Sequence, residues 1–127
     1  YAKENNIELS KDDKMCTSVL HGIIGADIVK KKYRFTDEMC RAIHYHTTGI
    51  TNMTLLGKIV YVADKIENSR NYPEAEVLRE RFNQCESLDE FILYDIDYYT
   101  LPKMIEKKKV IHPNTINVRN EIIEKMK

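Results

Sequence analysis

Three residues with side chains that commonly bind metal ions stand among apolar neighbours in this sequence of 127 residues. His21 interrupts the apolar face of one predicted helix, and His46 stands where a second runs out into a Thr-Thr-Gly turn. Asp64 follows a run of apolar or aromatic residues at positions 59–63. A carboxylate on an apolar face is costly unless it is paired or bound to a metal. Because imidazole and carboxylate suit Fe, Mn, Co or Zn, these residues indicate a metal site.

Simpler interpretations of the same residues stay open at this stage. A single histidine on an apolar face, such as His21, is more often a hydrogen-bonded core residue than a ligand. Asp64 could form a buried ion pair with a lysine or with Arg70. The metal hypothesis is favoured because all three residues lie on the apolar faces of successive predicted helices.

The turn after the second of these histidines offers groups that bind phosphate. Thr47, Thr48 and Gly49 supply hydroxyls and exposed backbone amides, and such turns hold anions. Lys58 is a candidate phosphate contact, and the guanidinium of Arg70 suits a phosphate held by two hydrogen bonds. Solvated positions for Lys58 and Arg70 are equally compatible with the sequence. No catalytic residue beyond the metal ligands is predicted.

Two further histidines are predicted not to be ligands. His44 lies two residues from His46, about 200° around a helix, and so points away from it. His112 precedes a proline at a helix start.

Composition excludes several classes of function. Lys plus Arg (20) equal Asp plus Glu (20), so no overall basic field attracts nucleic acid or an anionic membrane. No apolar run approaches the roughly 20 residues that cross a bilayer, and no signal peptide is visible. The three cysteines match no zinc motif and indicate a cytoplasmic protein with reduced thiols.

Apolar residues recur at helical spacing, so we predict an all-α fold of about six helices in a single domain covering residues 1–127. Residues 1–6 are interpreted as the tail of an earlier helix, and residues 7–14 as a polar connection. The predicted helices span about 17–32, 37–46, 55–67, 73–83, 88–109 and 114–126.

Several helix boundaries carry specific signals. Thr36 and Ser87 are predicted N-caps, and either Asn52 or Thr54 caps the helix between them. Pro102 should kink or split the helix that contains it, because it removes one backbone donor.

Four segments, in this order, resemble the YqeK-like branch of the HD-domain metal-dependent phosphohydrolases. The first is HGIIGA at residues 21–26, similar to the family's H-G-x-x-G-A, and the second is AIHYHTTG at 42–49, similar to A-I-x-Y-H-T-T-G. The third is LLGKIVYVADKIE at 55–67, which resembles L-L-E-K-I-x-Y-x-A-D-x-I-E. The last is HPNT at 112–115, which resembles a late H-P-D-T.

This resemblance implies an HD-domain-like helical bundle that hydrolyses symmetrical dinucleoside polyphosphates, such as diadenosine tetraphosphate to two ADP. It implies a two-metal site, with iron or else Mn, Co or Zn, whose ligands include His21, His46 and Asp64. The residues that would hold the polyphosphate are Thr47, Thr48, Gly49, Lys58 and Arg70.

The sequence departs from the family pattern at positions that bear on the site. The family is named for a His-Asp pair that lies upstream of the H-G element, and this chain contains no His-Asp dipeptide. We therefore interpret the chain as the C-terminal portion of an HD-type domain, inactive by itself, with an exposed apolar patch that favours a homo-oligomer. Ile50, Gly57 and Asn68 replace a usual Arg, Glu and Pro.

Two rival functions remain. A mononuclear iron protein could use His21, His46 and Asp64 as a complete triad of two histidines and one carboxylate, although such triads usually sit on β-barrels. A non-catalytic helical interaction module could use the same polar residues only to fix packing.

Overall fold

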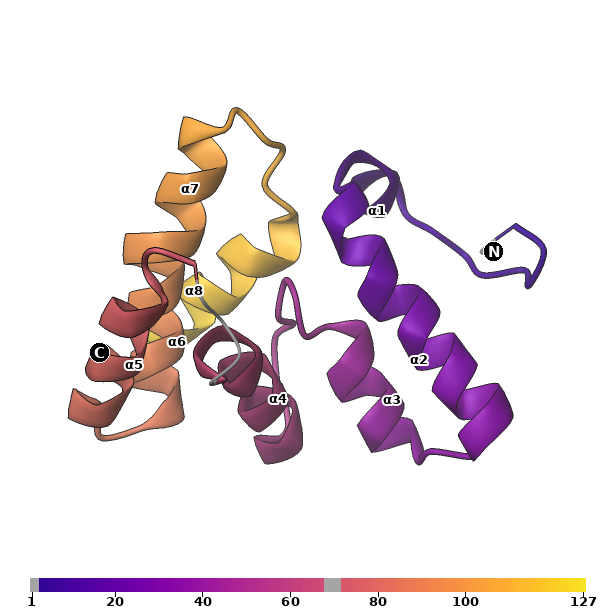
Figure 1. The fold of residues 1–127 in the computed structure, drawn as a ribbon, viewed down its shortest axis with the longest axis horizontal. Coiled ribbons are helices and arrows are strands. Elements are labelled where there is room, and N and C mark those ends of the chain that lie inside the picture. Colours follow the sequence, from indigo (N-terminus) through magenta and orange to yellow (C-terminus); the bar gives the residue numbers. More distant parts are fainter. Residues whose placement is uncertain (1–2, 68–71) are drawn as a thin grey trace.

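The computed structural model describes residues 3–67 and 72–127, and this part of the chain is helical and contains no strand (Figure 1). The predicted all-α class is confirmed. No helix among these residues is both long and apolar enough to cross a membrane. The elements are α1 (Lys11–Met15), a 3₁₀ turn η1 (Thr17–Val19), α2 (Leu20–Tyr33), α3 (Asp37–His44), α4 (Leu55–Ile66), α5 (Ala75–Gln84), α6 (Leu88–Asp95), a π-helical turn η2 (Ile96–Thr100), α7 (Leu101–Glu106) and α8 (Pro113–Lys125).

Side-chain caps start three of the helices where the sequence places them. Thr36, Thr54 and Ser87 each accept a hydrogen bond from the backbone amide three residues further on. Each cap satisfies one of the amides that the first helical turn leaves without a partner. Of the two caps considered for α4, Thr54 is the one used.

The start of the chain differs from the prediction. Residues 3–6 form a turn, with Asn6 at a φ of 55°, and not the tail of a helix. The stretch interpreted as a polar connection contains α1, whose N-cap Ser10 forms a capping box with Asp13. The spacing Ser-x-x-Asp is itself a helix-start signal, so the sequence does carry the information for this short helix.

The proline in the longest helical stretch changes its hydrogen-bond pattern without ending it. Pro102 occupies the second position of α7, directly after the π-helical turn η2. The amide of Leu101 bonds the carbonyl of Ile96 five residues back, so the backbone ladder shifts register just where the proline lacks a donor. α6 and α7 therefore follow one another in a single column (Figure 1).

The core is divided between two clusters of apolar side chains. The larger one joins α4, α5, α6 and α8 around Tyr61 and Phe91, which are both fully buried. The smaller one lies at the start of α2 and consists of Cys16, Val19 and Ile23. Between the two clusters, α2 packs on α3 and α3 packs on α4, so α3 connects the two parts of the molecule (Figure 1).

A buried histidine ties the N-terminal part of the chain to α8. His112 caps α8, because its Nδ1 accepts a hydrogen bond from the amide of Asn114 at 3.1 Å. Its Nε2 must then carry the proton, which it donates to Oδ1 of Asp13 at 2.9 Å. The expectation that His112 is not a metal ligand agrees with this structural role.

We predict that Asp13 stabilises the fold in a pH-dependent way. Partial burial raises the pKa of Asp13, but its hydrogen bonds with His112 and Ser10 outweigh that effect and lower the pKa below its ordinary 3.8. A lowered carboxyl pKa adds stability above the unfolded-state pKa, and this stability is lost as pH falls through the folded-state pKa. Asp13→Asn should therefore cost about 1–2 kcal/mol at pH 7 and much less near pH 3.

Urea unfolding at both pH values measures this difference. Asp12→Asn, one residue away on the same helix, is the matched control and should show a small effect at either pH. Equal losses for Asp13→Asn at pH 7 and pH 3 would contradict the assignment.

Candidate metal centre

His21 and His46 face one another across the contact between α2 and the end of α3. Their Nε2 atoms lie 3.1 Å apart, and the rings meet edge to face at 79° with centroids 4.9 Å apart. Two imidazoles that bind one ion at about 2.0–2.1 Å have this nitrogen separation when their angle at the ion is roughly 95–102°. The two predicted histidines therefore form a pair whose donor atoms suit a single metal ion.

The backbone fixes the orientation of the His46 ring. Nδ1 of His46 lies 2.6 Å from the carbonyl oxygen of Ile43, an acceptor, so Nδ1 carries the proton and donates it. The lone pair is then on Nε2, toward His21, as in metal-binding histidines oriented by a second hydrogen bond. α3 ends at His44, so the predicted helix end at His46 is wrong by two residues.

The position of His21 rests on the glycine that follows it. His21 is exposed in the first turn of α2, which rules out the interpretation as a core histidine. A Cβ atom on Gly22 would lie 3.0 Å from the carbonyl oxygens of Ile43 and His44 and 3.2 Å from Cε1 of His46. Only a glycine lets the α2 backbone come this close to the segment that carries His46.

Of the three turn residues predicted to hold phosphate, one lies at the histidine pair. The hydroxyl of Thr47 is 3.4 Å from Nε2 of His21. Thr48 is buried, and its hydroxyl donates to the carbonyl of Gly49 at 2.8 Å. Gly49 is also buried and has a φ of 77°, in the left-handed region that suits glycine. Thr48 and Gly49 therefore shape the turn, and Thr47 is available for a ligand.

A hydrogen bond from α8 also holds this turn in place. The buried hydroxyl of Thr115 donates to the carbonyl of Thr48 at 3.0 Å. This contact spans 67 residues of sequence, so spacing arguments could not find it. The start of α8 thus contacts α1 through His112 and the turn after His46 through Thr115.

Asp64 lies on α4 and is half-buried. The buried face of α4 consists of Gly57, Tyr61 and Val62, and Ala63 is exposed, so the predicted apolar stripe through Ala63 to Asp64 is rotated from the true one. Among residues 3–67 and 72–127, no three His, Cys, Asp or Glu side chains are grouped to hold one ion. The structure therefore brings the two histidines together without a third ligand, and Asp64 as a ligand stays a prediction.

Residues 2–69 match the HD domain family. This match covers more than half of the chain and includes both histidines of the pair. The chain belongs to the HD domain family. The resemblance first drawn from four short segments, and the predicted HD-like fold, are therefore confirmed.

Two relatives of this HD domain carry the same enzyme name. The chain is 35% identical over 105 residues to the symmetrical bis(5'-nucleosyl)-tetraphosphatase of Staphylococcus aureus, a match that covers 82% of this chain and 54% of that protein. It is 33% identical over 110 residues to the enzyme of the same name from Halalkalibacterium halodurans, covering 86% and 57%. The chain thus spans about half the length of the curated relatives it matches.

A solved structure shows the same fold. The crystal structure, described as that of a predicted HD superfamily hydrolase involved in NAD metabolism from Clostridium acetobutylicum, superposes with a TM-score of 0.85 at 34% sequence identity. The match covers 98% of this chain and 65% of that one.

Lys58 and Arg70 are the remaining residues predicted to contact substrate in this HD domain. Lys58 forms an ion pair at 2.9 Å with Asp89 of α6, and both side chains are partly buried. A role for Lys58 in joining α4 to α6 explains its position without a phosphate. Arg70 lies outside the described residues, so its predicted role in binding phosphate stays a prediction.

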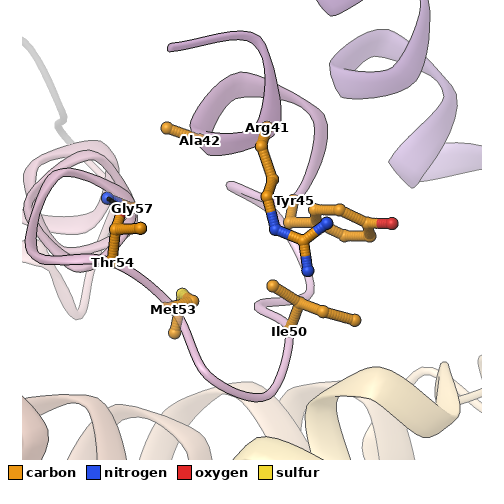
Figure 2. Close-up of a pocket in the computed structure, with 7 residues that line it drawn as sticks. All are labelled: Arg41, Ala42, Tyr45, Ile50, Met53, Thr54 and Gly57. Atoms are coloured by element: carbon orange, nitrogen blue, oxygen red, sulfur yellow. Dashed lines mark hydrogen bonds between the residues drawn. The ribbon is translucent and has the colours of Figure 1, made fainter. Parts of the chain in front are cut away.

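A cavity between the end of α3 and the start of α4 is too small for a substrate. Figure 2 shows Arg41 of α3 extending along the ring of Tyr45 toward Ile50, with Thr54 and Gly57 at the start of α4 on the opposite wall. The Arg41 guanidinium lies 5.1 Å from the Tyr45 ring centre. The cavity has a volume of about 10 Å³, enough for roughly one water molecule. This cavity therefore has no room for a nucleotide.

The neighbouring histidine lies apart from the pair. His44 packs on Tyr45 with ring centres 4.3 Å apart and lines a separate cavity between α2 and α3 beside Asp27. Burial lowers the pKa of His44, which favours the neutral ring.

A buried carboxyl group that sequence reasoning missed holds α4 in place. Asp95 is fully buried and accepts hydrogen bonds from the hydroxyls of Tyr61 at 3.1 Å and Thr100 at 3.0 Å. Burial raises the pKa of Asp95, and burial and Asp95 together raise that of Tyr61. The sequence did contain a signal for this buried carboxyl group, because Asp95 interrupts the apolar spacing of Ile92 and Ile96. Asp95 is thus a fully buried carboxyl group on an apolar helix face, whereas Asp64 is only half-buried.

We predict that Gly22→Ala separates the two histidines. The added methyl group meets two backbone carbonyl oxygens at 3.0 Å, which cannot move without displacing the turn. The variant should lose about 1–3 kcal/mol of stability and most of its affinity for a divalent metal. Thermal melts in chelator and Zn²⁺ titration measure the two effects.

Gly25→Ala, one turn later on α2, is the matched control. A Cβ at Gly25 would meet only Cγ2 of Ile43 at 3.7 Å, an ordinary contact. This variant should gain up to about 1 kcal/mol from helix propensity and keep its metal affinity. Similar behaviour of the two variants would contradict the close-approach argument.

Proposed function

We propose that this chain forms part of a metal-dependent phosphohydrolase that splits symmetrical dinucleoside polyphosphates, such as diadenosine tetraphosphate to two ADP. The observation that carries the proposal is the histidine pair, with Nε2 atoms 3.1 Å apart and the His46 ring oriented by the Ile43 carbonyl. The names of the relatives supply the substrate class.

The residues of this chain that would hold the metal are His21 and His46, with Asp64 as a further predicted ligand. HD domain enzymes depend on metal ions, and we infer a two-metal centre with iron, for which Mn, Co or Zn are the alternatives that this donor set also accepts. When bound, such ions lower the pKa of a water molecule and polarise phosphoryl oxygens. A catalytic metal usually has more than two ligands from the protein. Further ligands therefore complete the centre that the two imidazoles begin.

Thr47 is the side chain of this chain best placed to orient substrate. Its hydroxyl lies beside Nε2 of His21, at the edge of the pair where a phosphate oxygen would approach the metal. The hydroxyl can donate a hydrogen bond to that oxygen. Thr48 and Gly49 hold Thr47 in position through the turn.

The rival functions have less support. A mononuclear iron site needs a complete triad, and the described part of the chain does not group three such ligands. An interaction module would use the histidines only for packing, but His21 is exposed.

Metal content and hydrolysis test the proposal together. His46→Ala should reduce bound metal more than about tenfold and abolish release of ADP from diadenosine tetraphosphate by the intact enzyme. His44→Ala is the matched control, because His44 lies two residues away and outside the pair. Unchanged metal content in His46→Ala would contradict the proposal.

Asp64→Asn separates the two interpretations of Asp64. If Asp64 is a ligand, the variant loses metal and keeps its stability in chelator. If Asp64 is instead half of an ion pair, metal content stays the same and stability in chelator falls by up to about 3–5 kcal/mol, less to the extent that Asp64 is exposed.

We also infer that the protein self-associates. Leu55 and Ile59, one turn apart on α4, expose 67% and 47% of their surface. Large apolar side chains grouped on one helix face commonly mark a contact surface. Light scattering should show a dimer or larger species that Leu55→Glu converts to a smaller one. A monomer at all concentrations in the unmodified protein would contradict this inference.

A further inference from the structure

A cavity lined mainly by lysines lies beside the C-terminal end of α4. It has a volume of about 160 Å³, and its walls are formed by Lys65 at the end of α4, by the turn η2, by α7 and by the residues after α7. Four of its seven lining residues are lysines and none is acidic; they are Lys65, Tyr99, Thr100, Lys103, Met104, Lys107 and Lys109. Neither histidine of the pair lines this cavity.

The fold brings two of these lysines together by ending α7 in a tight turn. Lys108 has a φ of 54°, and its amide bonds the carbonyl of Ile105 at 3.1 Å. The amide of Lys109 bonds the carbonyl of Met104 at 2.9 Å. This left-handed turn reverses the chain, so Lys107 and Lys109 line the same cavity although one residue separates them.

The positive charge of the cavity is only partly balanced. Lys103 forms an ion pair at 2.6 Å with Glu74, which does not line the cavity. Glu74 also attracts Lys107, and Glu106 attracts Lys103. Lys65 lies 5.4 Å from the ring centre of Tyr61. The buried Asp95 lies behind Thr100, and its burial disfavours the charged form. Several like charges around one cavity repel one another, and a multiply charged anion relieves this repulsion.

Lysines near a helix C-terminus are often explained by the helix dipole alone. That explanation does not account for this cavity. Lys30, Lys31 and Lys32 at the end of α2 are also exposed at a helix C-terminus, where positive charge is favourable. Lys31 pairs with Asp27 on the same helix. The lysines of the α7 cavity instead come from different elements and converge.

An aromatic ring completes the cavity. Tyr99 is half-buried and packs against Tyr72, with ring centres 5.5 Å apart. A ring held in this way offers a face on which a nucleobase can stack. Lysines together with an aromatic wall match a nucleotide better than a simple inorganic anion.

A second cavity adjoins this one and reaches η1. It has a volume of about 290 Å³, shares Met104 and Lys109 with the first, and reaches Thr17 and Ser18 of η1. η1 leads directly into α2, which carries His21 in its first turn. The chain after α7 lies opposite α1, as the bond between the thiol of Cys16 and the carbonyl of Val110 at 3.4 Å also shows (Figure 1).

We propose that the lysine-lined cavity binds the distal phosphates and base of a nucleoside polyphosphate whose other end lies at the histidine pair. The proposal rests on the function proposed above for the reacting end. It adds a binding subsite in which Lys65, Lys107 and Lys109 contact phosphate and Tyr99 stacks on the base.

Calorimetric titration of the purified protein tests the subsite without any need for hydrolysis. The probes are ADP and inorganic tripolyphosphate, each titrated in chelator at about 150 mM salt. The double variant K107Q/K109Q should bind both probes at least about tenfold more weakly. The double variant K32Q/K127Q removes the same charge from exposed positions and should stay within about twofold of the unmodified protein.

Two variants at Tyr99 test the aromatic wall. Tyr99→Ala should weaken ADP binding about tenfold more than tripolyphosphate binding, whereas Tyr99→Phe keeps the ring and should retain both affinities. Equal losses of the two probes in Tyr99→Ala would overturn base stacking. Equal losses in the two lysine double variants, or no binding at this salt concentration, would overturn the subsite.

The variant His46→Ala separates this proposal from the preceding one. In His46→Ala the cavity should bind ADP with unchanged affinity even though metal binding is lost. ADP binding without any hydrolysis by the intact enzyme would contradict the proposed function but not the subsite. Hydrolysis with an unchanged KM in K107Q/K109Q would contradict the subsite but not the proposed function.

Discussion

His21 and His46 face one another because two stretches of backbone come almost into contact at Gly22. A side chain at that position would meet the last carbonyls of α3, and any increase in the separation of α2 and α3 moves the two imidazoles apart directly. The small residues Gly22 and Ala26 continue this approach along one buried face of α2. The candidate metal centre is therefore a product of helix packing, and its geometry is only as rigid as that contact.

The first turn of α8 supports the same centre from the other end of the chain. His112 donates to Asp13 of α1, the helix that precedes η1 and α2. Thr115 donates to the carbonyl of Thr48, two residues after His46. Both hydrogen bonds are buried or partly buried, where a bond is stronger and an unpaired group more costly than in water. Docking of α8 thus holds both the turn that follows His46 and the short helix that precedes α2, which couples the centre to the C-terminal part of the fold.

Charge in this protein is organised locally although it cancels overall. Equal numbers of acidic and basic residues exclude a uniform basic field, yet lysines from α4, α7 and the following turn converge on one cavity. The same local organisation places Asp95 in the core, where two hydroxyls satisfy one of its oxygens. Net charge therefore limits the long-range field of the molecule and says little about the anions that a particular cavity can bind.

The sequence by itself determined the helical class, most helix starts, and the two histidines, because these depend on local signals such as caps, apolar spacing and short ordered motifs. It could not determine which way α4 is rotated. The face of α4 that is buried depends on Asp95, Phe91 and Ile92 of α6, which lie some thirty residues away, and this rotation leaves Asp64 only half-buried. Tertiary structure alone decided that His46 faces His21, that Thr48 is buried in the turn, and that separated lysines share a cavity. Each of these outcomes depends on contacts between distant segments, and local sequence patterns carry no record of such distances.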